Sequence, residues 1–121
     1  MTQRVLVVED EALIAIAVEA ILEETGFPCE LAVDGEQAMA ALDRSGGRFS
    51  AVVAAIRLPQ GPDGWEVARH ARMLNPDLPV IYVSGDSAPH WEANGVPGSV
   101  MLSKPYAFSE LTKTLTELVR Q

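Results

Sequence analysis

The sequence lacks the features of secreted and membrane-spanning proteins. Cys29 is the only cysteine among its 121 residues, which excludes an intramolecular disulfide framework and a zinc site built from several cysteines. No apolar run approaches the roughly 20 residues that a membrane-spanning helix needs. Residues 1–4 do not have the pattern of a signal peptide. We therefore expect a cytoplasmic protein with no membrane partner.

Basic residues are also scarce. Nine Lys and Arg stand against 17 Asp and Glu, so the net charge is −8. Nucleic-acid binding depends on a basic face that neutralises phosphates, and no such face is visible. There is no low-complexity segment, internal repeat or flexible linker. At 48% apolar and 21% charged residues, the chain is expected to fold as a single domain over residues 1–121.

Five short apolar segments alternate with longer helical ones. Their near-continuous apolar character is typical of parallel strands covered on both faces. The expected strands are 4–8, 29–33, 51–55, 79–84 and 99–103. This alternation predicts an α/β fold, a five-stranded parallel doubly wound sheet of the flavodoxin-like order 2-1-3-4-5 with helices on both faces.

Capping residues set the limits of the helices. Asp34 with Gln37, and Asp63 with Glu66, have the spacing of a capping box. Segment 87–98 is different, because it contains two prolines and two glycines. We expect the fourth helix there to be short or disordered.

Candidate functional residues follow the ends of the predicted strands. Glu9 and Asp10 follow the first strand, Ala55 ends the third, Ser84 ends the fourth and Lys104 follows the fifth. Ligands of such sheets bind beyond the carboxyl ends of the strands. Carboxylates favour Mg²⁺, while a lysine and a hydroxyl suit phosphoryl oxygens. Each residue alone has an ordinary structural explanation, but together they predict a phosphoryl-binding site that lacks a nucleophile.

These motifs resemble those of bacterial response regulator receiver domains, in order and over essentially the whole chain. The matching segments are Val5 to Glu11, Ile56 to Pro59 with Asp63 and Gly64, Val83 to Gly85, and Lys104 with Pro105. The resemblance implies a signalling switch, not an enzyme. In that family a histidine kinase or phosphotransfer protein donates a phosphoryl group to an aspartate that ends the third strand.

The resemblance also implies roles for individual residues. Glu9 and Asp10 match the acidic pair that holds Mg²⁺, with Asp10 expected as the direct ligand, and Arg57 would offer a backbone carbonyl. Ser84 matches the switch hydroxyl, and Lys104 the lysine that contacts the phosphoryl group. A cis bond between Lys104 and Pro105 is implied as well.

The sequence departs from the family at its centre, because Ala55 occupies the position of the phosphoacceptor aspartate. A methyl group cannot form an acyl phosphate, and Mg²⁺ binding should weaken with the loss of a carboxylate. An engineered Asp-to-Ala change and a natural receiver that signals by binding alone both explain this. We favour the engineered form, because drift after a natural loss should erode the other motif positions, which are intact.

Two further departures concern output. Met101 stands where the family often has an aromatic residue, and the broken segment 87–98 occupies the fourth helix. Trp91 within it is a candidate anchor for a partner. The family often pairs through the fourth helix, fifth strand and fifth helix, so we expect a monomer or a weak dimer.

Three classes of function remain to be weighed. The first is a stand-alone receiver acting through contact with a downstream target protein, or a receiver cut from a hybrid kinase. The second is a phosphorylation-independent adaptor on the same fold. The third, a flavodoxin or Rossmann-type cofactor domain, is disfavoured because Glu9, Asp10 and Glu11 stand where a glycine-rich phosphate loop would be needed.

Overall fold

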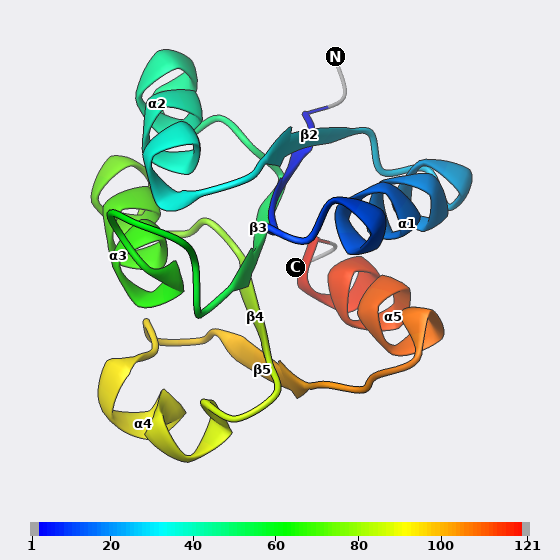
Figure 1. Ribbon diagram of the computed structural model, residues 1–121. Helices are drawn as coiled ribbons and strands as arrows, with labels where there is room; N and C mark the ends of the chain where they lie inside the picture. Colours follow the sequence, from blue (N-terminus) through cyan, green and yellow to red (C-terminus); the bar gives the residue numbers. More distant parts are fainter. Residues whose placement is uncertain (1–2, 120–121) are drawn as a thin grey trace.

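A five-stranded parallel sheet forms the centre of the computed structural model, which describes residues 3–119 (Figure 1). The strand order is β2-β1-β3-β4-β5, so the predicted fold class is confirmed. The strands are β1 (Val5–Val8), β2 (Cys29–Ala32), β3 (Ala51–Ala55), β4 (Val80–Ser84) and β5 (Val100–Ser103). Each predicted strand is present, to within one residue at either end.

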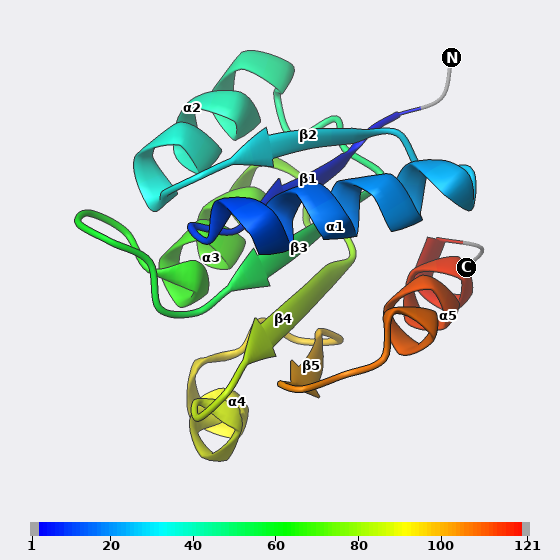
Figure 2. The ribbon, with the colours of Figure 1, turned by 45° about the vertical axis from the view of Figure 1, so that its right-hand side comes forward.

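Helices cover both faces of the sheet. α1 (Ala12–Glu24) and α5 (Phe108–Val119) lie on one face, and α2 (Gly35–Ser45) and α3 (Gly64–Leu74) lie on the other (Figures 1 and 2). The fourth helix is short, as predicted. It consists of a 3-10 turn (Ala88–His90) followed by α4 (Trp91–Asn94).

The core has two layers because the central strands bury side chains on both faces. Leu6 and Val8 pack toward α2 and α3, whereas Val5 and Val7 pack toward α1 and α5. All four are at most 2% exposed, which explains why β1 is continuously apolar rather than alternating. The sheet is therefore held from both sides by apolar burial.

The N-terminal caps of α2 and α3 differ from each other. Asp63 and Glu66 form the complete predicted capping box at α3. At α2, the Asp34 side chain accepts a hydrogen bond from the Gln37 backbone N–H at 2.8 Å. The Gln37 side chain accepts from the Val33 N–H at 3.0 Å instead of returning to Asp34. The predicted capping box at α2 is thus only half formed.

Polar contacts fix the glycine- and proline-rich segment around α4. The Val96 backbone N–H donates to the buried Tyr82 hydroxyl at 3.1 Å, and the Trp91 indole N–H donates to the Ser99 hydroxyl at 3.0 Å. Arg72 on α3 donates to the Pro97 carbonyl at 2.7 Å. Trp91 remains 37% exposed, so part of it is accessible to a partner.

Two exclusions drawn from the sequence have structural counterparts. Cys29 is buried in β2, where burial, reinforced by Glu23 and Glu19, raises the pKa of its thiol to about 12. It is a core side chain and not a reactive thiolate. Within residues 3–119, the helices are too short or too polar to cross a membrane.

Gly64 allows α3 to begin directly against the end of β3. Its N–H donates to the Ile56 carbonyl at 2.8 Å, and a Cβ added at Gly64 would collide with the Ala55 carbonyl. Gly64→Ala should therefore lower the free energy of unfolding by about 1–3 kcal/mol. Urea unfolding measures this change. Gly85→Ala is the matched control, because an added Cβ meets nothing within 4 Å there, and an equal loss in both variants would contradict the prediction.

Candidate functional site

A cavity of about 430 Å³ opens at the carboxyl edge of the sheet. β1, β3, β4 and β5 or the loops after them supply its walls. Its lining residues are Asp10, Glu11, Ala55, Ile56, Arg57, Val83, Ser84, Gly85, Asp86 and Lys104. The structure thus brings together Asp10, Ala55, Ser84 and Lys104, as the strand-end argument predicted, and Arg57, which the resemblance implied, lines the same cavity.

Glu9 is placed differently from Asp10. Its side chain is buried beside the cavity, where Oε1 lies 3.4 Å from Lys104 Nζ and Oε2 accepts from the Glu11 N–H at 3.1 Å. Burial raises the pKa of Glu9, and the Glu11 N–H and Lys104 offset this rise only in part. Glu9 therefore holds Lys104 in place, whereas the exposed Asp10 faces the cavity.

The donor set around this cavity is sparse for a divalent cation. Asp10 contributes a carboxylate and Arg57 a backbone carbonyl, but Glu9 is engaged with Lys104 and Ala55 has no donor atom. Over residues 3–119, no cluster of three or more His, Cys, Asp or Glu side chains is arranged to hold a metal ion. Because Mg²⁺ requires close to octahedral oxygen coordination, the residues present fit this ion poorly.

Ser84 points its hydroxyl into the loop that follows β4. Its Oγ accepts from the backbone N–H of Ser87 at 2.9 Å and of Asp86 at 3.2 Å, and lies 3.4 Å from Asp86 Oδ1. The hydroxyl therefore stabilises the turn while lining the cavity. The same Ser84 side chain thus holds the turn and is placed to contact a ligand in the cavity.

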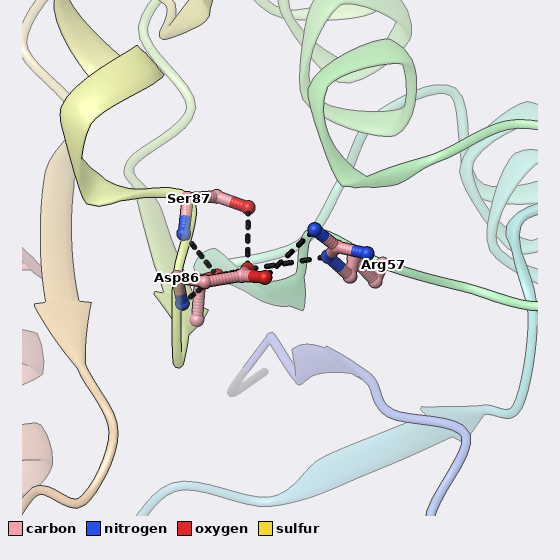
Figure 3. Close-up of polar contacts among 4 residues, drawn as sticks. Arg57, Asp86 and Ser87 are labelled. Atoms are coloured by element: carbon pink, nitrogen blue, oxygen red, sulfur yellow. Dashed lines mark hydrogen bonds and ion pairs between the residues drawn. The ribbon is translucent and has the colours of Figure 1, made fainter.

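An ion pair between Arg57 and Asp86 crosses the cavity rim (Figure 3). The guanidinium Nη2 lies 2.7 Å from Asp86 Oδ2, and Nε donates to Oδ1 at 3.2 Å. Desolvation raises the pKa of Asp86, but the hydrogen bonds and charge of Arg57 and the hydroxyls of Ser87 and Ser84 together outweigh it, so the pKa lies below its usual range. This pair joins the β3–α3 loop to the β4–α4 loop.

The sequence motifs pointed only to the backbone carbonyl of Arg57 and to no role for Asp86. The pair could have been predicted, because Arg57 and Asp86 have opposite charges and follow the third and fourth strands, which are neighbours in the predicted order. Elsewhere, the Lys104–Pro105 bond is cis, as the resemblance implied. Met101 is partly buried on β5 against the core, where its flexible side chain fills space next to Tyr82.

The fold and this cavity place the chain among flavodoxin-like α/β domains whose site lies at the carboxyl ends of the strands. The model of the response regulator receiver domain matches residues 5–116. The chain belongs to this family and is a receiver domain of two-component signalling. Members of this family are signalling proteins that interact with histidine kinases and downstream effectors.

Individual relatives agree with this assignment. The transcriptional regulatory protein TcrA of Mycobacterium tuberculosis is 35% identical over 120 residues, which cover 98% of this chain and 46% of TcrA. The crystal structure of a response regulator receiver protein from Sinorhizobium medicae is 37% identical in sequence. The match covers 98% of this chain and 95% of the Sinorhizobium chain, with a TM-score of 0.93. The chain spans about half the length of the curated regulators it matches.

One structural relative bears on the metal. The receiver domain of the sensor histidine kinase PA1611 of Pseudomonas aeruginosa has a magnesium ion coordinated in its active site cleft. It is 27% identical, both chains are covered completely, and the TM-score is 0.80.

The raised pKa of Glu9 predicts a specific pH dependence of stability. A carboxyl group with a higher pKa in the folded chain binds its proton more tightly there than in the unfolded chain. The free energy of unfolding should therefore fall as pH rises above the ordinary Glu9 value of 4.5. Urea unfolding at several pH values in metal-free buffer should show this fall for the chain, and a weaker one for Glu9→Gln.

Glu117→Gln is the control, because Glu117 is an exposed glutamate on α5. It should follow the unsubstituted chain across the pH range. Parallel profiles for the chain and Glu9→Gln would show that Glu9 does not contribute, and would contradict the prediction.

Proposed function

We propose that this chain is a receiver domain in a phosphorylation-deficient form, and that it acts through protein contact. The observation that carries the proposal is the place of Ala55, which ends β3 and lines the cavity together with Ser84 and Lys104. Acyl phosphate formation needs a nucleophilic oxygen at this position. A methyl group supplies none, while the other candidate residues surround it.

The surrounding residues have the roles that the family resemblance implies. Asp10 and the Arg57 carbonyl would be ligands of a cation if a carboxylate stood at position 55. Ser84 and Lys104 would contact phosphoryl oxygens if an acceptor were present. Lys104 Nζ lies 3.4 Å from Glu9 Oε1, so the positive charge of the lysine has a carboxylate partner although the aspartate is missing. This arrangement is expected of a receiver changed at one position, and we retain the engineered Asp-to-Ala change as its proposed origin.

A natural adaptor that never depended on phosphorylation is the second candidate. The Arg57–Asp86 pair favours it, because it connects the two loops without any phosphoryl group. The two candidates differ in one respect: the pocket of an adaptor should not become phosphorylated when an aspartate is restored at position 55.

Protein contact has candidate surfaces on both sides of the cavity. Leu13 and Ile16 on the first turns of α1 are 84% and 57% exposed, which is unusual for large apolar side chains near each other on one helix. We propose this face for a histidine kinase or phosphotransfer protein. The face formed by α4, β5 and α5, with Trp91, is proposed for a downstream target or for weak pairing of two copies.

Restoring the carboxylate should restore magnesium binding. Ala55→Asp should bind Mg²⁺ at least about tenfold more tightly than the unsubstituted chain, because it adds a charged oxygen ligand beside Asp10. Isothermal titration with magnesium chloride measures this difference. Ala55→Asn fills similar space without the charge and should gain much less. Equal affinities in all three proteins would contradict the proposed ligand set.

Restoring the carboxylate should also restore phosphorylation. Ala55→Asp incubated with acetyl phosphate and Mg²⁺ should gain one phosphoryl mass, because the aspartate Oδ attacks phosphorus and acetate leaves. The unsubstituted chain and Ala55→Asn should not change in intact mass. If Ala55→Asp also remains unmodified, the disabled-switch proposal fails and the adaptor replaces it.

A further inference from the structure

Positive charge is concentrated at the end of the sheet opposite the cavity around Ala55. A pocket of about 370 Å³ lies there, where β1 and β3 begin and α2 ends. Its lining residues are Gln3, Arg4, Glu30, Arg44, Ser45, Arg48 and Phe49. Three arginines and one glutamate give this lining a charge of +2, on a chain whose net charge is −8.

The arginines of this pocket are available for a ligand. Arg44 forms a surface ion pair with Glu30, and such pairs contribute little and exchange readily. Within residues 3–119, Arg4 and Arg48 have no carboxylate partner, and both are exposed. Guanidinium groups of this kind bind carboxylates and phosphates in bidentate geometry.

A second pocket, of about 390 Å³, shares the lining residues Gln3 and Phe49 with the first. This second pocket is lined by Ser50, Arg72, Asn75 and Asp77, and by apolar residues that include Leu118. Ser50 Oγ is buried without a hydrogen-bond partner among the described residues. Buried hydroxyls are nearly always paired, so Ser50 Oγ is an unsatisfied group beneath the surface of this pocket.

We propose that this groove, named here the basal groove and defined by Arg4, Arg44, Arg48, Phe49 and Ser50, binds a short acidic segment of a partner protein. Acidic side chains of that segment contact the arginines. The following residues of the segment lie toward the second pocket, beside Arg72 and Asn75.

The charge distribution selects a short acidic peptide over a nucleic acid. The basal groove is a local patch, and the remainder of the described surface is dominated by acids. A long polyanion would extend beyond the groove onto that acidic surface, whereas a short segment fits within about one screening length of the arginines. Because the groove lies at the amino ends of the strands, its binding does not depend on the chemistry of Ala55.

A direct binding measurement tests the proposal. The probe is a fluorescein-labelled peptide with three glutamates followed by leucine and valine, and its partner probe has glutamines in place of the glutamates. The full chain should bind the glutamate peptide and not the glutamine peptide, as measured by fluorescence anisotropy. Amide shifts on binding should map to Arg4, Arg48 and Ser50, and not to Ala55 or Ser84.

A pair of charge reversals separates the groove from the overall charge. Arg48→Glu should weaken binding by about tenfold, because it replaces attraction with repulsion. Lys113→Glu changes the net charge equally but lies on α5 outside the groove lining, and should leave the affinity nearly unchanged. If Arg48→Glu fails to fold, as judged by circular dichroism, Arg48→Gln and Arg4→Gln take its place and should each weaken binding.

Three outcomes overturn the proposal. The first is that the chain does not bind the glutamate peptide. The second is an equal loss of affinity in Arg48→Glu and Lys113→Glu, which indicates a nonspecific charge effect. The third is tighter binding of a single-stranded DNA oligonucleotide that the Arg48 variants abolish, which would assign the groove to a nucleic acid instead.

Discussion

The parallel register of the sheet is the constraint on which the cavity depends. β1 pairs with β3 so that Val8 lies beside Ala54, and β3 pairs with β4 so that Ala55 lies beside Val83. Ser84 in turn lies beside Ser103, one residue before Lys104. Groups from four distant parts of the chain meet because these strands end together, and apolar burial on both faces fixes this alignment.

Ion pairing then determines how the cavity is arranged around Ala55. Glu9 and Lys104 neutralise each other on one side, and Arg57 and Asp86 do so on the other. Arg57 and Asp86 follow the neighbouring strands β3 and β4, whereas Glu9 follows β1 and Lys104 follows β5, so this pair spans the two strands between them. An aspartate at position 55 would bring another carboxylate close to Glu9 and Asp10, so a cation or Lys104 would have to offset their repulsion. The alanine form needs no such compensation.

The sequence was sufficient to predict the fold and the set of strand-end residues, because both follow from apolar periodicity and chain order. Asp10, Ser84 and Lys104 reach the cavity for this reason. The orientation of side chains was not predictable in the same way. Glu9 turns into the protein toward Lys104, while Gln37 bonds Val33 instead of Asp34. These choices depend on differences in distance and burial that appear only once the strands are assembled.

The two ends of the sheet are chemically distinct, and this difference bears on how the domain can signal. The carboxyl end carries acids around Ala55, whereas the amino end carries Arg4, Arg44 and Arg48. In a receiver that can be phosphorylated, phosphorylation changes the affinity for a partner at either end only if the phosphorylated and unphosphorylated states differ in conformation. With alanine at position 55 that difference has no covalent source. A partner at the proposed basal groove would then bind with an affinity that phosphorylation does not change, which is the behaviour expected of a constitutive binding module rather than of a switch.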